Sequence, residues 1–454
     1  MTELRCNSAR ASSETLRETH SEGDDMVAKK PLCITGNGII QQSQLSQSDL
    51  TDPAPAGYVS PALPSKKGDV HSQAGLTAYI NALKSGVNYA VAPTAYTHGA
   101  TVVATGELSG VYAPKKNRIY ITPNLQTSAT TWQYIDCSNG SVVSYTHGAT
   151  VVANGYAGGV YSVAQDRIYL NPQLQATATV WHYIECSTGS VVAYTHGATV
   201  VSNGYQGGGV LSPKQQRIYF TPFAQSTVAI WHYINCVNGA LVGYTHGGLS
   251  VVALAYLGGV YSPTQDRIYF CPYNQATNGI WHYLDCATGS ITQYAHGATA
   301  VAPAYNGGVY SPTQNRIYFV PNSQATATVW HYIECSTGSV VAYTHGATVV
   351  SAGYGGGCYC PRQNRIYFSP VSQSSATVWH YIDCETGSVV AYTHGLTVVP
   401  NAYYGAVYSP TEDRVYFMPY AQSTAAVWHY IDTSVYDGLT ISRDLMAGPL
   451  FSHY

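Results

Sequence analysis

Histidine is the residue type whose spacing in this chain first suggests chemistry. The chain has 454 residues and 16 histidines, and one series of them precedes a glycine at intervals of 49 or 50 residues. That series is His98, His147, His196, His246, His296, His345 and His394. A second series follows tryptophan: His182, His232, His282, His331, His380 and His429. Histidine ligates metals and exchanges protons near neutral pH, so both roles have to be weighed.

The spacing of these histidines does not suit a metal site. The sequence contains no His-x-x-x-His or Cys-x-x-Cys pair that would bring two ligands together locally. Equivalent residues of neighbouring packed sheets lie about 10 Å apart, whereas zinc ligands must lie about 2 Å from one ion. We therefore expect no metal and no cofactor, and a hydrogen-bonding role for the histidines.

An acidic position also recurs, and it invites a catalytic interpretation. Its copies are Asp136, Glu185, Asn235, Asp285, Glu334, Asp383 and Asp432. The asparagine copy argues against required ionisation, and the position at the start of a turn predicts backbone capping. No copy of the repeat has its own acid–base pair, nucleophile or phosphate loop. We therefore expect a protein that is not an enzyme.

The repeat that carries these residues predicts a small sheet. The fifth copy reads Gly-Gly-Val-Tyr-Ser-Pro-Thr-Gln-Asp-Arg-Ile-Tyr-Phe over 258–270, then Trp-His-Tyr-Leu-Asp-Cys over 281–286 and Ser-Ile-Thr-Gln-Tyr-Ala-His-Gly over 290–297. Short β-branched and aromatic runs between turn residues indicate four antiparallel strands per copy, with two apolar faces. Seven such copies predict an all-β fold, a seven-bladed β-propeller of four-stranded antiparallel blades.

These motifs resemble the YVTN-type propeller repeat, in which a Ser-Pro-Asp-Gly turn and an Ile-Asp-x-x-Thr-Gly turn recur. The resemblance covers residues 96–433 and implies the fold, but it leaves the function open. The link after each His-Gly is longer than in that pattern, so 149–152 could be a loop or an added strand. The recurring arginines, such as Arg267 and Arg316, are expected to tie blades together.

The strand order predicts how the ring closes. An outer strand over 89–99 precedes the first complete repeat, and the last repeat has no outer strand of its own. The N-terminal strand should therefore complete the blade that begins with the strands of Arg414 and Trp428, which protects both edges.

The remaining segments define the domain organisation. Residues 1–30 are predicted to be a disordered tail, with Met26 as an alternative start, and 31–88 an arm or linker with room for a short hairpin. The propeller covers 89–433, and a C-terminal extension covers 434–454. Residues 30–49, with an Asn-Gly turn and a Gln-Gln pair, resemble a segment of phage tail-fibre and other virion proteins. An ordinary hairpin with an Asn-Gly turn is the alternative.

Composition limits the partners and the location. Charged residues make up 9% of the chain and the net charge is −3, so no basic patch for nucleic acid is expected. No apolar run approaches 18 residues, and the N-terminus has no apolar signal core, so we expect no membrane insertion and no signal peptide. The predicted location is the virion if the protein is viral, and otherwise the cytoplasm.

Cysteine usage indicates packing. The chain has 11 cysteines, six of which occupy one equivalent position per repeat: Cys137, Cys186, Cys236, Cys286, Cys335 and Cys384. Adjacent sheets are too far apart for these to pair, because a disulfide needs Cα atoms within about 7 Å. We expect free, packed thiols.

Two recurring polar positions are the candidates for binding. They comprise the tyrosines of the long links, Tyr156, Tyr205, Tyr256, Tyr305, Tyr354 and Tyr403, and the glutamines Gln126, Gln175, Gln225, Gln275, Gln324, Gln373 and Gln422. Aromatic faces and amides suit sugar rings or a protein surface, although tyrosine also serves in packing between blades. The expected function is a non-catalytic binding propeller of a virion fibre or attachment apparatus, with other virion proteins or surface glycans as partners. A lectin-like protein and a purely structural ring are the alternatives.

Overall fold

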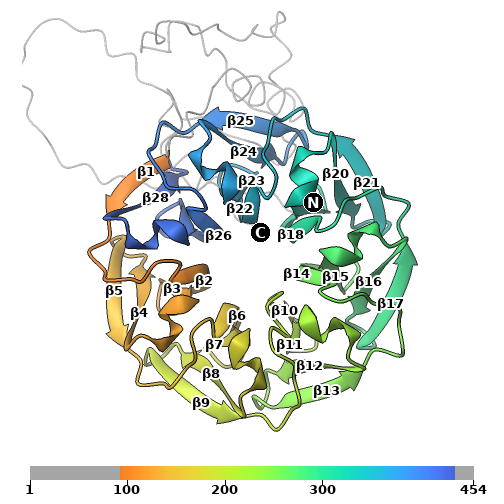
Figure 1. Ribbon diagram of the computed structural model, residues 1–454, viewed down its shortest axis with the longest axis horizontal. Coiled ribbons are helices and arrows are strands. Elements are labelled where there is room, and N and C mark those ends of the chain that lie inside the picture. Colours follow the sequence, from red (N-terminus) through yellow and green to blue (C-terminus); the bar gives the residue numbers. More distant parts are fainter. Residues whose placement is uncertain (1–92, 435–454) are drawn as a thin grey trace, which may run out of the picture. The chain divides into compact units, whose positions relative to one another are not determined.

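The computed structural model describes residues 93–434, which belong to the unit Tyr89–Tyr454 of the chain. These residues form seven four-stranded antiparallel sheets arranged in a ring (Figure 1). The fold class predicted from the repeats is therefore confirmed. The predicted tail, hairpin arm, alternative start and residues 435–454 of the C-terminal extension lie outside the described residues.

Each blade runs from the axis outward in chain order, as in the sheet β2-β3-β4-β5. The innermost strands are β2 (Glu107–Ala113), β6 (Tyr156–Ser162), β10 (Gly209–Ser212), β14 (Tyr256–Ser262), β18 (Tyr305–Ser311), β22 (Tyr354–Cys360) and β26 (Tyr403–Ser409). The second strands are β3 (Arg118–Pro123), β7 (Arg167–Pro172), β11 (Arg217–Phe220), β15 (Arg267–Pro272), β19 (Arg316–Pro321), β23 (Arg365–Pro370) and β27 (Arg414–Pro419). Blades 1 to 7 are numbered here in this order.

The third strands contain the tryptophans, and the outer strands end at the His-Gly pairs. The third strands are β4 (Thr131–Asp136), β8 (Val180–Glu185), β12 (Ile230–Asn235), β16 (Ile280–Asp285), β20 (Val329–Glu334), β24 (Val378–Asp383) and β28 (Val427–Asp432). The outer strands are β5 (Ser141–Thr146), β9 (Ser190–Thr195), β13 (Leu241–Thr245), β17 (Ser290–Ala295), β21 (Ser339–Thr344), β25 (Val389–Thr393) and β1 (Pro93–Thr97).

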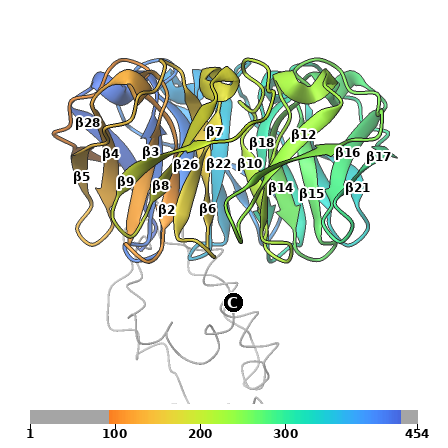
Figure 2. The same ribbon diagram turned by 90° about the horizontal axis from the view of Figure 1, so that it is seen from below.

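A 3-10 helix joins the second strand of each blade to the third. These helices are η2 (Leu125–Ser128), η3 (Leu174–Thr177), η4 (Ala224–Thr227), η5 (Asn274–Thr277), η6 (Ser323–Thr326), η7 (Ser372–Ser375) and η8 (Ala421–Thr424). They lie along the upper rim of the ring in Figure 2. Among residues 93–434 no helix is long and apolar enough to cross a membrane. Residues 149–152 have no strand assignment, so the open question about that link is resolved in favour of a loop.

The ring closes as the strand order predicts. β1 pairs with β28 from Pro93↔Ile431 to Thr97↔Val427, in the sheet β1-β28-β27-β26. His98 follows β1, stacks on Trp428 with ring centroids 3.9 Å apart, and donates from Nε2 to the Ala425 carbonyl at 2.5 Å. The two ends of the propeller are therefore joined both by a strand ladder and by a buried aromatic stack.

The core lies between the blades, where each apolar face packs against its neighbour. In one such layer, Trp281 of blade 4 packs with Tyr305, Phe319 and Cys335 of blade 5. All seven tryptophans are fully buried. The six repeat cysteines are buried in these layers as free thiols, which agrees with the packing role expected for them. Burial of both faces explains why neither face of a strand alternates with polar residues.

Candidate functional site

The link tyrosines lie inside the blades and not at the surface. All six are 0% exposed. Each hydroxyl is hydrogen-bonded to Nδ1 of the histidine that follows the tryptophan on the third strand, as in Tyr156–His182 at 2.6 Å and Tyr305–His331 at 2.5 Å. The expectation that these tyrosines form surface pockets is therefore wrong: five of them begin an innermost strand, Tyr205 precedes β10, and all six lie in the layers between blades. That they bind a ligand stays a prediction.

The recurring glutamines are also buried, with exposed fractions between 0% and 4%. Gln275 shows their role: its Oε1 accepts from the Val252 backbone N–H at 2.9 Å, and its Nε2 donates to the Ile280 carbonyl at 2.9 Å. The corresponding bonds recur in the other blades, as for Gln126. Each glutamine thus connects a long link to the start of a third strand, because the oxygen and the nitrogen of its amide both bond to backbone groups.

Burial keeps the Tyr–His pairs neutral. It lowers the pKa of His182, His232, His282, His331, His380 and His429 to about 4, with a smaller contribution from a neighbouring histidine of the His-Gly series. It also raises the pKa of the partner tyrosines well above the usual range. A neutral hydroxyl and a neutral imidazole therefore share one hydrogen bond in a dry layer.

Removing one of these hydroxyls is expected to destabilise the ring. Tyr256→Phe leaves the His282 Nδ1 atom buried without its partner, and this should cost about 1–3 kcal/mol in the free energy of unfolding. Urea unfolding followed by tryptophan fluorescence measures the change. Tyr283→Phe, on the third strand of the same blade, is the control, because its ring stacks under Arg267 and its change should be small. Equal stability of Tyr256→Phe and the unmodified protein would contradict the packing role.

Blade 1 departs from this pattern in both partners. Glu107 occupies the tyrosine position and Gln133 the histidine position, and both side chains are 1% exposed. Neither carboxyl oxygen of Glu107 has a hydrogen-bond partner among the described residues, and burial raises its pKa well above the ordinary range. Glu107 is therefore a neutral acid in the interior of one blade. Both exceptions are visible in the sequence, but only the structure shows that Glu107 and Gln133 take the two places of one Tyr–His pair.

The axis of the ring contains a cavity of about 250 Å³. It is lined by the first residues of the innermost strands, at the same end of the ring as the 3-10 helices, because Tyr256 pairs with Pro272 just before η5. Glycine allows the innermost strands to meet there. A Cβ on Gly258, whose φ is +96°, would lie 2.7 Å from the Cα of Gly307 in the next blade. Backbones of neighbouring innermost strands are therefore in contact around the axis, and this ring of glycine contacts forms the frame of the cavity.

Two positions near the axis vary from blade to blade. The residue after the link tyrosine, or after Glu107 in blade 1, lines the cavity: Leu108, Ala157, Gln206, Leu257, Asn306, Gly355 and Tyr404. The residue before the proline at the end of the second strand, or just after that strand in blade 3, varies as well: Thr122, Asn171, Thr221, Cys271, Val320, Ser369 and Met418. Two of its copies, Asn171 and Val320, line the cavity. The variation at these positions is visible in the aligned copies, but it does not stand apart there, because peripheral turn residues such as Val237 and Glu385 vary as well.

The axial cavity carries amide groups with unused hydrogen-bonding capacity. Asn306 is 9% exposed, and its Nδ2 donates to the Tyr354 carbonyl at 3.1 Å. Its Oδ1 has no partner among the described residues, and neither has Oδ1 of Asn171, which is 3% exposed. Gln206 and the aromatic ring of Tyr404 also line the cavity. Buried polar atoms are normally satisfied, so these acceptors favour a ligand that brings its own donors.

The other recurring polar residues have structural roles. Histidines of the His-Gly series stack on tryptophan, as in Trp281–His296 with centroids 3.9 Å apart, and bond to a backbone carbonyl. The acidic position caps its turn as predicted in the aspartate and asparagine copies: Asp285 Oδ1 accepts from the Ala287 backbone N–H at 3.0 Å. The glutamate copies differ, as Glu185 accepts from Arg167 Nε at 2.8 Å. The arginines stack within their own blade, as Arg267 does on Tyr283, and Nη1 of Arg267 also lies beside Gly338 in the turn of the next blade. Residues 93–434 contain no cluster of three or more ligating side chains that could hold a metal.

Comparison with known proteins supports the fold alone. No family model matches the chain. No curated protein matches it either. Among solved structures it is similar to the extracellular domain of a protein from B. thetaiotaomicron that is described as a one component system, with a TM-score of 0.52 and 10% sequence identity. The match covers 77% of this chain and 44% of that one, so this chain spans less than half of that structure.

Proposed function

We propose that this protein is a binding propeller, without catalytic activity, whose ligand site is the cavity on the ring axis. The observation that carries this proposal is the coincidence of variable positions, unpartnered amide oxygens and a fixed glycine frame at one place. Packing alone would favour the same residue at a lining position, as it does for the buried tryptophans and link tyrosines. Diversity at the positions that line the cavity is what a recognition surface requires.

The chemistry of the cavity favours a polyhydroxylated ligand. Asn171 and Asn306 offer carbonyl oxygens to hydroxyl donors, Gln206 offers an amide, and Tyr404 offers an aromatic face. A volume of about 250 Å³ is small beside ordinary ligand pockets, which hold about 300–1,000 Å³. We propose one sugar residue, free or at the end of a surface glycan, as the occupant. This moves the carbohydrate site predicted from the sequence to the axis.

A role in a virion fibre or host attachment is the biological setting that we propose for such a site. Its support is the likeness of residues 30–49 to a segment of phage tail-fibre and other virion proteins, and the multivalent display that fibres provide. Linked copies of a weak site can raise avidity by roughly 10²–10⁴. A purely structural ring is the alternative, and it is favoured by the burial of the six link tyrosines.

A glycan array is the test of the axial site. The triple variant Asn171→Ala, Asn306→Ala, Tyr404→Ala should lower affinity for the captured glycan at least tenfold, because each lost hydrogen bond costs about 1 kcal/mol. The control is Val237→Ala, on an exposed turn at the periphery where 75% of the side chain is accessible. Binding of glycan by both variants alike, or no captured glycan at all, would leave the structural ring as the better account.

A further inference from the structure

A second polar arrangement recurs in every blade, where the second strand begins. The arginine that opens the strand stacks on a tyrosine of the third strand, as in Arg118–Tyr134 at 4.2 Å and Arg414–Tyr430 at 4.3 Å. A second tyrosine lies two residues after the arginine. In blades 2 to 6 its hydroxyl donates to a glutamine two residues before the arginine: Tyr169 to Gln165, Tyr219 to Gln215, Tyr269 to Gln265, Tyr318 to Gln314 and Tyr367 to Gln363.

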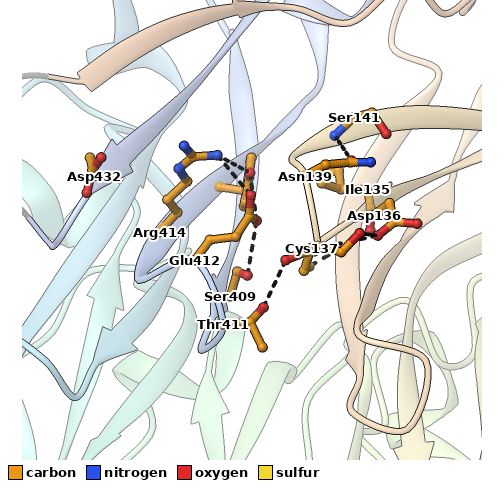
Figure 3. A network of polar contacts seen from close by, with 12 residues as sticks. Ile135, Asp136, Cys137, Asn139, Ser141, Ser409, Thr411, Glu412, Arg414 and Asp432 are labelled. Carbon is orange, nitrogen blue, oxygen red and sulfur yellow. Dashed lines mark hydrogen bonds and ion pairs between the residues drawn. The ribbon is translucent and has the colours of Figure 1, made fainter. Parts of the chain in front are cut away.

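Blade 7 places a carboxylate in this arrangement. Glu412 stands at the glutamine position, and its Oε1 accepts from Arg414 Nη1 at 2.8 Å. Its Oε2 accepts from the Tyr416 hydroxyl at 2.9 Å and from the Ser409 hydroxyl at 3.2 Å. Figure 3 shows this network beside the turn of blade 1. The arginine and tyrosine of a blade can therefore hold a carboxylate, with charge-assisted hydrogen bonds to both oxygens.

Blade 1 lacks an acceptor at the same position. Its residue there is Lys116, which is exposed and cannot accept a hydrogen bond. The Tyr120 and Tyr145 hydroxyls and the Arg118 Nε are buried atoms without a hydrogen-bond partner among the described residues. Tyr120 as a whole is 0% exposed. The Tyr120 hydroxyl sets blade 1 apart, because its equivalents in blades 2 to 7 donate to a glutamine or a glutamate, whereas equivalents of the other two groups are unpartnered in further blades as well.

A cavity of about 240 Å³ lies at this place, between blades 1 and 2. Its lining includes Arg118, Tyr120, Tyr134, Tyr145 and the turn Thr188–Ser190. The glycine of that turn, Gly189, has only Tyr120 Oη within 4 Å of a Cβ built on it, at 3.6 Å. At the junction of blades 4 and 5, the equivalent Gly338 also meets Gln265 Nε2 at 3.2 Å. The cavity thus occupies the volume that a glutamine side chain fills elsewhere.

We propose that this cavity is a binding site for the carboxylate of a small organic acid. The carboxylate oxygens accept from Arg118 and from the Tyr120 hydroxyl, as those of Glu412 accept from Arg414 and Tyr416 in blade 7. Tyr145 supplies a further donor, and the Tyr134 ring holds the guanidinium in place. The site uses no residue of the axial cavity, so it stands independently of the proposed glycan site.

The carboxylate site is tested with acetate as the probe and acetamide as its neutral isostere. In NMR titrations of the full chain, acetate should bind with a Kd in the millimolar range and acetamide at least tenfold more weakly. K116E should abolish acetate binding, because it supplies an internal carboxylate as Glu412 does, and R118Q should abolish it by removing the cation. K116E alters an exposed side chain, so its melting temperature should match or exceed that of the unmodified protein.

A gain of function provides the converse test. Blade 4 has an arginine whose Nε is also unpartnered, Arg267, and Q265K reproduces there the residues of blade 1. In the double variant R118Q/Q265K, the affinity for acetate should return to within a few-fold of that of the unmodified protein. The proposal is overturned if acetate does not bind the unmodified protein at 100 mM, if acetamide binds equally well, or if K116E binds acetate unchanged.

Discussion

Lowering the pH from 7 to 4 is expected to remove most of the free energy of unfolding of this propeller. Six buried histidines have a pKa of about 4 in the folded ring, against about 6.5 in an unfolded chain. Between these values the unfolded chain binds more protons, so stability is present above about pH 6.5 and is lost as the pH falls toward 4. Each histidine contributes at most about 1.4 kcal/mol per pH unit. The free energy of unfolding of a domain is only about 5–15 kcal/mol, so part of the combined loss from the six histidines is enough to remove most of it.

Urea unfolding at a series of pH values, followed by tryptophan fluorescence, measures this dependence. His282→Gln, which copies the amide that blade 1 carries as Gln133, should make the dependence shallower by one proton. Glu107 acts in the opposite direction: its raised pKa gives stability that is present below about pH 4.5 and is lost as the pH rises. One such group cannot offset six histidines. Stability that does not change between pH 7 and 4 would show that the imidazoles are not neutral in the folded ring.

Removing β1 is expected to open the ring. A truncation that begins at residue 93 keeps the ladder to β28, whereas one that begins at residue 100 loses the ladder together with the stack of His98 on Trp428. The second truncation exposes the edge of β28 and part of the layer that contains Tyr96, Tyr430 and Trp428. We expect a much lower melting temperature and a broader transition than in the first truncation, which is the matched control.

Calorimetry on both truncations measures whether β1 is needed to close the ring. The joint between blades 7 and 1 has further bonds that both truncations retain. The Thr411 hydroxyl bonds to the Cys137 carbonyl at 2.9 Å (Figure 3), and also to Asn117 Oδ1 at 2.8 Å. Coincident melting curves would mean that these contacts and the inner strands close the ring without β1. An intermediate with a separately melting seventh blade would instead support the role of β1.

The fold could be predicted from the sequence because each blade repeats the same local signals. Turn residues, a glycine-rich first strand and two apolar faces recur seven times, and the lone strand before the first repeat determines the closure. The site could not be predicted in the same way. Tyr256 and Gln275 are candidates because they recur in the repeats. A residue that recurs in equivalent blades, however, is one that every blade needs for packing.

The informative positions are those where the copies differ. Asn171, Asn306 and Tyr404 vary around the axis, and Lys116 replaces a glutamine in a single blade. Their meaning depends on three-dimensional proximity, which a one-dimensional alignment of copies does not contain. Asn171 lies one residue before the end of β7 and Asn306 is the second residue of β18, and only the ring brings them to the same cavity.

The pairing of β1 with β28 also has a consequence for synthesis on the ribosome. The first strand of the propeller is made first, and its partner follows 330 residues later, since Thr97 pairs with Val427. At about 10 residues per second, β1 waits roughly half a minute for β28. Meanwhile each emerging third strand, such as β4, offers it a similar edge before its own outer strand arrives. The ring closes correctly only if each third strand pairs with its own outer strand, as β4 does with β5, before β1 pairs with it. In blade 7, no outer strand follows β28 among the described residues, so nothing there competes with β1.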